Sequence, residues 1–469
     1  MNVSSSPLTT ANAIPADYRL RMPGPAAVPE RVRAATALPI LSHRGAEFRA
    51  ILDEVTSGLR RVLGTKHHVF LLGVSGTGGM EAALVNVLSE GDTVLIVENG
   101  QFGERFSAIA EQMPVTVDKI VVPWGEAPDP DRIAARVKAN RYRAVVVIHN
   151  ESATGVVADL AGIGAVLRET ETLLVVDSVS GVGGVDMRMD EWGADVVVTA
   201  SQKSLMCPPG LAIAGVSEKA MRVVDAARGM PRYFFDFRRA KTSLDKGETP
   251  FTPPVSLILG LREALVMIDE EGLPAVLKRH ARLASALRAG FEALGFPMFP
   301  TARPFSSTVT VGVVPEGLDG SAIVRHMYAN YRTVIAGQRT KLRNRVIRIG
   351  TMGAVGPEDI FADLHYLERT LRDLGKRTRA GCRRAGGRSG PGGIGGSYCL
   401  IRSFVYGLAA WPRSGDDHAD PTNDRVPSRR CGPRVRRSGG RPRQGRGLYV
   451  ERLQSQSLCL RCVQERDRH

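Results

Sequence analysis

The sequence predicts an α/β protein built on a mainly parallel sheet. Seven short apolar runs, rich in β-branched residues and bounded by turn-forming residues, recur between residues 69 and 216. Strands that are apolar throughout are typical of a sheet with helices on both faces, and the segments between the earlier runs have helical composition. We expect strands at residues 69–72, 93–97, 119–122, 144–149, 173–177, 195–200 and 211–216. The last two runs are too close for a crossover helix, so one of these strands should run antiparallel.

Helical segments alternate with the earlier strands. Residues 47–63 place Phe48, Leu52 and Val55 on one apolar stripe, as an amphipathic helix requires. Further helices are expected at residues 79–88, 102–112 and 130–139.

The part of the chain before the tail predicts a second, smaller α+β domain, in which helices pack on an antiparallel sheet. A helix at residues 256–271 should end the large domain. The small domain should have helices at residues 273–294 and 357–374 and strands at residues 308–314 and 345–350. We expect a flexible N-terminal segment at residues 1–20, a large domain at 21–271, a small C-terminal domain at 272–375 and a tail at 376–469.

The net charge of +15 is concentrated in the tail. Residues 376–469 hold 21 Lys and Arg against 7 Asp and Glu, whereas residues 1–375 hold 42 against 41. The tail is rich in Arg, Gly, Pro and Ser and lacks an apolar period, so we expect it to be disordered. We interpret it as a non-native, out-of-frame or read-through extension. Cys459 and Cys462 resemble half a zinc site without its second half, so we expect no metal.

Composition excludes several classes of protein. Only Cys207 precedes the tail, which is not the pattern of a disulfide scaffold and fits a reducing cytoplasm. No apolar run approaches the roughly 20 residues that span a bilayer, and the N-terminus lacks an apolar signal core. We therefore expect a soluble, cytoplasmic protein without a membrane partner. The basic and aromatic stretch 232–239 could be a nucleic-acid patch, but a partly buried loop or a subunit contact is the preferred interpretation.

Lys203 is the first candidate for chemistry, because it follows the predicted strand 195–200 almost directly. Open α/β sheets bind ligands at the carboxyl ends of their strands. A lysine that is partly desolvated there can lose its proton and form a Schiff base with an aldehyde. Most lone lysines in loops are solvated surface residues, so the assignment depends on the accompanying residues.

Asp177 ends the predicted strand 173–177. A carboxylate at this position can accept a hydrogen bond from a protonated ring nitrogen, which pyridoxal phosphate needs to act as an electron sink. A single strand-end aspartate is more often a helix cap or a turn former. An aspartate and a lysine at the ends of successive strands are a much rarer combination.

A glycine-rich turn between a strand and a helix lies within residues 69–84. The backbone N–H groups at the helix start and the hydroxyls of Ser75 and Thr77 suit a phosphate. The turn also resembles a dinucleotide-binding fingerprint, with Glu98 about twenty residues further on, but the third small residue of that fingerprint is missing. The turn alone is therefore weak support for either ligand.

Four motifs occur together in a familiar order. They are Ser75-Gly-Thr-Gly-Gly-Met-Glu-Ala-Ala83, Asn150-Glu-Ser-Ala-Thr-Gly155, Asp177-Ser-Val-Ser180 and Ser201-Gln-Lys203. With them, the chain resembles the class V aminotransferases of pyridoxal-phosphate fold type I, and most of all the alanine–glyoxylate and serine–glyoxylate branch. The resemblance implies transfer of an amino group from a small amino acid, of the alanine or serine type, to a 2-oxo acid such as glyoxylate or pyruvate. It also implies the cofactor pyridoxal 5'-phosphate and a homodimer with sites at the interface.

The resemblance assigns catalytic and ring-binding roles. Lys203 would hold the cofactor aldehyde and move protons, and Asp177 would pair with the ring nitrogen. Val179 would pack beneath the ring, opposite Phe102, which stands where the family commonly has a tryptophan. Stacking should survive that change.

The resemblance also assigns phosphate and substrate contacts. Gly76 and Thr77 match the phosphate cup, and Ser152 and Gln202 match positions that touch the cofactor's hydroxyl and phosphate. Thr252 matches a residue that reaches the phosphate of the other subunit, whereas Thr249 stands where relatives often have a tyrosine. Arg348 matches the arginine that grips the substrate carboxylate, because a guanidinium can form two parallel hydrogen bonds to it, and Arg345 is its rival.

Two alternative functions follow from other features. A lyase or desulfurase of the same fold would use the same lysine and aspartate, and sulfur transfer would need a mobile cysteine, for which Cys207 is expected to be too constrained. A protein that binds nucleic acid non-specifically would do so through its basic tail, with a strong dependence on salt.

Overall fold

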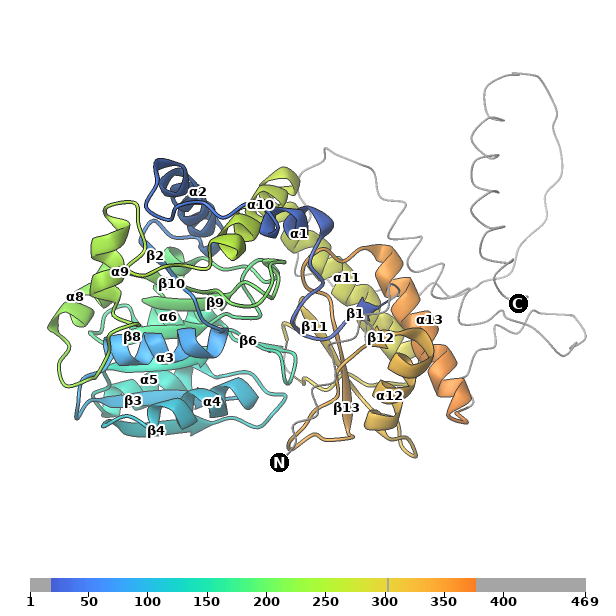
Figure 1. The fold of residues 1–469 in the computed structure, drawn as a ribbon. Coiled ribbons are helices and arrows are strands. Elements are labelled where there is room, and N and C mark those ends of the chain that lie inside the picture. The colour runs from blue at the N-terminus through green and yellow to red at the C-terminus, as the bar shows by residue number, and fades with distance from the viewer. Residues whose placement is uncertain (1–17, 302, 377–469) are drawn as a thin grey trace, which may run out of the picture. The chain divides into compact units, whose positions relative to one another are not determined.

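The computed structural model describes residues 18–301 and 303–376 of the chain (Figure 1). The predictions for the flexible start of the chain, the disordered tail and the half zinc site fall mostly or wholly outside the described residues. In the described ranges, no helix is both long enough and apolar enough to cross a membrane.

A seven-stranded sheet forms the centre of the fold, in the order β2-β10-β9-β8-β5-β3-β4. Its members are His68–Leu72 (β2), Thr93–Glu98 (β3), Thr116–Val121 (β4), Ala144–Ile148 (β5), Leu173–Asp177 (β8), Val196–Ala200 (β9) and Ala212–Val216 (β10). Strand β10 runs antiparallel to both of its neighbours, and the other pairs are parallel. The predicted α/β fold, its seven strands and the one antiparallel member are therefore confirmed.

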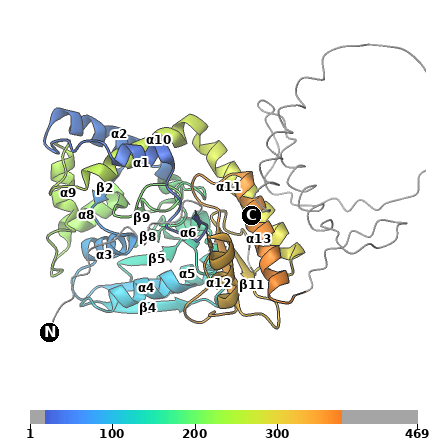
Figure 2. The same ribbon diagram turned by 45° about the vertical axis from the view of Figure 1, so that its right-hand side comes forward.

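Helices cover both faces of this sheet (Figures 1 and 2). They are Ala46–Leu63 (α2), Gly76–Val87 (α3), Gln101–Ala110 (α4), Pro130–Ala139 (α5), Leu160–Leu167 (α6), Met189–Trp192 (α7), Glu218–Ala226 (α8), Phe237–Leu244 (α9) and Val255–Glu271 (α10). Successive strand residues face opposite sides, so Val145 and Val147 belong to one apolar core and Val146 to the other. This explains why the central strands are apolar without alternation.

The last part of the described chain packs around a third apolar core. Its elements are Leu273–Ala293 (α11), Val309–Val313 (β11), Gly320–Tyr331 (α12), Thr333–Val334 (β12), Val346–Gly350 (β13) and Pro357–Asp373 (α13). Strands β11 and β13 pair antiparallel, as predicted. The sequence did not predict several short elements, among them Arg19–Leu20 (β1), Glu30–Thr36 (α1), Asn150–Glu151 (β6) and Val156–Val157 (β7). The division into domains at residues 271 and 272 remains our proposal.

The start of the described chain is anchored beside this third core. Strand β1 pairs parallel with β12, and the buried Nε of Arg21 donates a 2.7 Å hydrogen bond to Oδ2 of Asp363 on α13. The carbonyl of Arg21 accepts a 2.7 Å bond from the N–H of Gly350. Because these bonds fix Arg21, they also fix the following residues 22–24, which reach the cavity described below.

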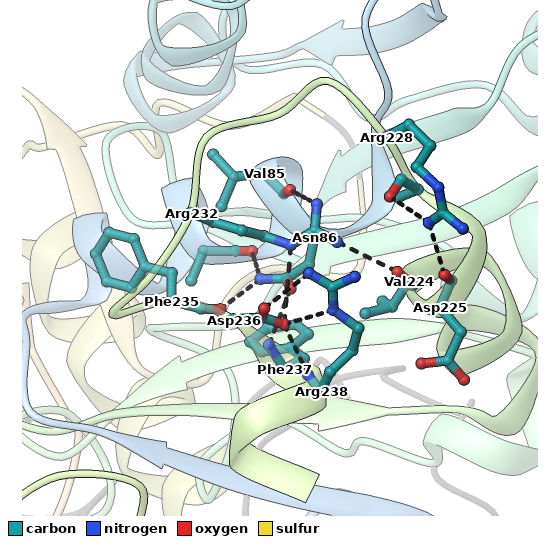
Figure 3. Close-up of polar contacts among 12 residues, drawn as sticks. Val85, Asn86, Val224, Asp225, Arg228, Arg232, Phe235, Asp236, Phe237 and Arg238 are labelled. Atoms are coloured by element: carbon teal, nitrogen blue, oxygen red, sulfur yellow. Dashed lines mark hydrogen bonds and ion pairs between the residues drawn. The ribbon is translucent and has the colours of Figure 1, made fainter.

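Residues 232–236 of the basic and aromatic stretch form a partly buried loop, one of the two preferred interpretations, and residues 237–239 begin α9 (Figure 3). The Arg232 side chain is 3% exposed, and its Nη1 donates a 2.9 Å bond to the carbonyl of Val85. Fully buried Asn86 donates a 2.6 Å bond from Nδ2 to the carbonyl of Phe235. The Arg232 guanidinium therefore ties the loop to α3 and does not face a solvent-exposed partner.

The neutral imidazole of His280 on α11 forms a hydrogen bond to the loop that follows β13. Its Nδ1 lies 2.7 Å from the carbonyl of Val276, and its Nε2 accepts a 3.0 Å bond from the N–H of Gly353. Burial lowers the pKa of His280 from 6.5 to about 4. If Nε2 became protonated, two N–H groups would face each other and the hydrogen bond from Gly353 would be lost. Low pH therefore destabilises this contact.

Replacing His280 by glutamine is expected to change the pH dependence of stability. Between pH 6.5 and 4 the unfolded chain binds the His280 proton and the folded chain does not, so this residue makes the wild-type free energy of unfolding fall as pH falls. The stability difference between wild type and His280→Gln should therefore be about 1 kcal/mol smaller at pH 5.5 than at pH 7.5. Urea unfolding at the two pH values measures it, and an unchanged difference would contradict the buried neutral histidine.

Candidate active site

A cavity of about 560 Å³ opens beside the loop that follows β9. Four residues predicted for the site line it: Lys203, Phe102, Ser152 and Arg348. The other walls come from residues 22–24, Gln101, α12 and residues 334–339. The cavity thus brings together residues that are far apart in the sequence, and it lies where open α/β sheets bind their ligands.

Lys203 presents its amine to this cavity from a nearly buried position, with 9% of the residue exposed. Its Nζ donates a 2.6 Å hydrogen bond to the carbonyl of Pro23. A Cβ on Gly24, whose φ is +98°, would lie 2.2 Å from this Nζ, so the close approach requires glycine. Burial lowers the pKa of Lys203 to about 8, and Asp177 opposes the shift. The amine can therefore lose its proton near neutral pH.

Asp177 ends β8, next to β9 in the sheet. Its Oδ1 accepts a 2.7 Å bond from the N–H of Val179, while no donor among the described residues reaches Oδ2. Burial raises the pKa of Asp177 to about 6, and the charge of Lys203 opposes the shift. The two groups affect each other's pKa without forming a direct ion pair, so a ligand could interact with both of them.

The glycine-rich turn places a helix start beside these residues. Helix α3 begins at Gly76, and a Cβ there would lie 3.0 Å from Cγ2 of Val179. The Oγ1 of Thr77 accepts a 3.1 Å bond from Nη1 of Arg105, whose guanidinium carbon lies 4.7 Å from the centre of the Phe102 ring. Arg105 was not predicted. It adds a positive charge to a helix start whose free N–H groups suit an anion.

Glu151 is a second residue that sequence reasoning missed. It is fully buried, and its Oε2 accepts a 2.8 Å bond from the N–H of Phe102, while Oε1 accepts a 2.9 Å bond from that of Ala153. Burial raises its pKa to about 7. Glu151 therefore positions the backbone of Phe102. The signal was present, because Glu151 lies inside the predicted motif 150–155, but nothing in the sequence showed what it contacts.

Backbone carbonyl groups fix the position of the Arg348 guanidinium. Nε and Nη2 donate 3.1 and 2.7 Å bonds to the carbonyl of Gly337, and Nη1 donates a 3.0 Å bond to that of Ser152. Three of its five N–H groups are thus used, and one remains on each terminal nitrogen. Such a pair can bind one carboxylate. Burial lowers the pKa of Arg348 to about 10, and its rival Arg345 is exposed and absent from the described lining of the cavity.

Seven other candidates lie outside the described lining of this cavity: Gly76, Thr77, Asp177 and Val179, described above, and Gln202, Thr252 and Thr249. Gln202 has a buried Oε1 without a partner among the described residues, and its carbonyl accepts a 2.8 Å bond from the N–H of Ala26. Thr252 is exposed. The hydroxyl of Thr249 donates a 2.8 Å bond to the carbonyl of Phe251, so it is used within its own loop.

The fold and site define an α/β enzyme with an amine and a guanidinium in the lining of one small cavity. A buried carboxylate, that of Asp177, lies close enough to the amine to raise its pKa against burial. Residues 31–352 match the family described as Aminotransferase class-V. The chain belongs to this family and is an aminotransferase, as the resemblance of the sequence motifs implied.

Named relatives support the same family. The L-aspartate–glyoxylate aminotransferase of Paracoccus denitrificans is 40% identical over 362 residues, which cover 76% of this chain and 91% of the relative. The serine–glyoxylate aminotransferase of Hyphomicrobium methylovorum is 37% identical over 370 residues, covering 77% and 91%. The crystal structure of an alanine–glyoxylate aminotransferase from Nostoc sp. superposes with a TM-score of 0.76 at 30% identity, covering 79% of this chain and 100% of that one.

Cys207 does not suit the desulfurase alternative. The residue is 1% exposed, and its Sγ donates a 3.4 Å bond to the carbonyl of Leu257. Burial raises the pKa of its thiol to about 12. Because the thiolate is the nucleophile, Cys207 is poorly suited to accept and carry sulfur.

Proposed function

We propose that the protein is a pyridoxal 5'-phosphate-dependent transaminase that moves an amino group from a small amino acid to a 2-oxo acid such as glyoxylate or pyruvate. The observation that carries the proposal is the amine of Lys203, nearly buried in a cavity with a lowered pKa and next to the strand that ends in Asp177. The glyoxylate named in all three relatives supports the acceptor.

The residues present fit this cofactor. Lys203 would hold its aldehyde, and Asp177 has an oxygen without a donor among the described residues for the ring nitrogen. The start of α3 with Thr77 would hold the phosphate. Val179 and Phe102 would cover the two faces of the ring. Ser152 and Gln202 would contact the cofactor's hydroxyl and phosphate, and Thr252 of the second subunit would contact the phosphate.

The cofactor supplies an electron sink for the bond at the substrate's Cα, and the chain supplies the rest. Arg348 binds the substrate carboxylate through its two remaining N–H groups and so fixes the direction of the Cα–H bond. The neutral Nζ of Lys203 accepts the Cα proton and later returns it. Asp177 would pair with the ring nitrogen of the cofactor through Oδ2, because Oδ1 accepts from the N–H of Val179.

We propose a cytoplasmic homodimer. Tyr233 and Phe234 are 64% and 45% exposed, and their rings lie 5.5 and 5.4 Å from that of Phe251, close in sequence to Thr252. Exposed stacked aromatic rings are typical of an interface. Sedimentation of the purified protein measures its mass: twice the chain mass is expected, and a monomer at all concentrations would contradict the dimer.

An amino-transfer screen tests the function. Purified protein with pyridoxal phosphate is incubated with single amino acids and either glyoxylate or pyruvate, and the new amino acid is quantified. Glycine or alanine should form in equal amount to the 2-oxo acid from the donor. Release of ammonia or sulfide without a new amino acid would instead support the lyase alternative and contradict the proposal.

A further inference from the structure

The cavity has more positive charge than an amino acid with one carboxylate needs. Arg325, Arg339 and Arg348 all line it, whereas its described lining contains no aspartate or glutamate. Such an imbalance favours a ligand with more than one negative charge. The proposed function uses Lys203 and Arg348 and leaves the other two arginines unexplained.

Arg339 and Arg325 are both exposed residues, but of the two only Arg325 has an acidic neighbour among the described residues. The side chain of Arg325 is 72% exposed, and its Nη2 lies 3.9 Å from Oδ2 of Asp319. The guanidinium of Arg339 has no acceptor among the described residues, although its backbone N–H is bonded. Its charge also contributes, after burial, to the lowered pKa of Arg348, so the two guanidinium groups lie near each other.

Gln338 adds a neutral donor at the same place. Its side chain lines the cavity, and the residue is 5% exposed. The Oε1 accepts a 2.9 Å bond from the N–H of Arg339, whereas the buried Nε2 has no acceptor among the described residues. A buried N–H group without an acceptor is unfavourable, and a carboxylate in the cavity would satisfy it.

The loop after β12 positions both Arg348 and Arg339. Ala336 and Arg348 exchange backbone hydrogen bonds of 3.0 and 2.6 Å, and the carbonyl of Gly337 accepts from the Arg348 side chain. Gln338 and Arg339 follow at once in the chain. The loop that holds the first guanidinium therefore also sets the position of the second.

We propose that the amino donor is an amino dicarboxylic acid of the aspartate or glutamate type. Its α-carboxylate would bind Arg348, and its side-chain carboxylate would bind the guanidinium of Arg339 and Nε2 of Gln338. This inference rests on the proposed function and replaces the neutral donor expected from the sequence by an acidic one.

Binding of an unreactive probe tests the inference without turnover. Succinate carries two carboxylates and propionate carries one, and titration calorimetry of the holoenzyme gives the Kd of each. Arg339→Gln should raise the Kd of succinate by about 10- to 100-fold, the effect of one charge-assisted hydrogen-bonded contact, and that of propionate by less than about threefold. Equal changes for both probes, or none for succinate, would overturn the inference.

Two further variants sharpen the result. Arg339→Lys keeps the charge and should retain succinate binding better than Arg339→Gln does. Arg325→Gln is the matched control, because it removes an arginine from the same lining that is exposed and near Asp319, and it should change the Kd of succinate by less than about threefold. If Arg325→Gln weakened succinate binding more than Arg339→Gln does, Arg325 would be the contact residue and the proposal would be wrong.

Donor kinetics separate this inference from the proposed function. In wild type, kcat/KM should be higher for aspartate or glutamate than for alanine, and Arg339→Gln should lower that ratio about 10-fold or more. An enzyme that transfers amino groups but prefers alanine, with a ratio insensitive to Arg339, would contradict the acidic donor and leave transamination standing. A protein that transfers no amino group from any donor would contradict transamination itself, and succinate binding would still report on Arg339.

Discussion

Replacing Lys203 by alanine is expected to lower kcat for amino transfer by about 10³-fold or more, because the variant loses the group that accepts and returns the Cα proton. The amine of Lys203 is nearly buried, is bonded to the carbonyl of Pro23 and has a pKa lowered to about 8. No other lysine is in the described lining of the cavity, so no second amine can replace it. Initial rates with saturating donor and glyoxylate measure the effect.

The matched control for this change is Lys246→Ala. Lys246 is exposed and lies in the loop after α9, so its removal should leave kcat within about twofold. Urea unfolding of both variants checks that they fold. A Lys203→Ala protein that folds and turns over as fast as Lys246→Ala would remove Lys203 from the mechanism.

Replacing Asp177 by asparagine should lower kcat by about 10²- to 10³-fold, because an amide cannot balance a positive charge on the ring nitrogen. The shape and the bond to the N–H of Val179 are retained, so the loss reports charge rather than packing. The same initial-rate assay measures it, and an unchanged kcat would contradict a partnership between this carboxylate and the cofactor.

A second measurement on Asp177→Asn addresses Lys203 directly. Asp177 is the largest influence that raises the pKa of Lys203 against burial, so its removal should move that pKa further below about 8. The pH dependence of acylation of Lys203 in the cofactor-free protein, followed by peptide mass spectrometry, gives this pKa. An equal pKa in both proteins would show that the two groups are not coupled.

The sheet was predictable because burial on both faces leaves no ambiguity in its central strands. Residues 144–148 are apolar throughout, residues 173–177 are apolar up to the terminal Asp177, and residues 196–200 contain one polar residue, Thr199. All of these residues are buried. Strand β4 lies at the sheet edge and begins at Thr116, three residues before the prediction. Its Asp118 and Lys119 form ion pairs with Arg136 and Glu111, so hydropathy did not mark that part of the strand.

Several short helices were missed although their caps are visible in the sequence. Ser217 accepts at its hydroxyl from the N–H of Ala220 at the start of α8, and Asp236 and Asp319 cap α9 and α12 in the same way. Each helix has twelve residues or fewer, so its apolar period is short. Attention to caps would have found these elements.

Site residues were predicted where a motif carried them and missed where tertiary contacts decide their role. Lys203, Phe102, Ser152 and Arg348 meet at one cavity, although their roles there remain proposals. Arg339 carries no motif. Its relevance appears only when the loop after β12 folds against β13 and leaves its guanidinium in the cavity.

The most direct test of the account is to locate the covalent attachment of the cofactor. The purified protein is saturated with pyridoxal phosphate, reduced with borohydride, digested and analysed by peptide mass spectrometry. We predict a stable phosphopyridoxyl group on Lys203 as the main product. Attachment to another lysine, or no attachment in a folded protein, would contradict the claim that this amine holds the cofactor.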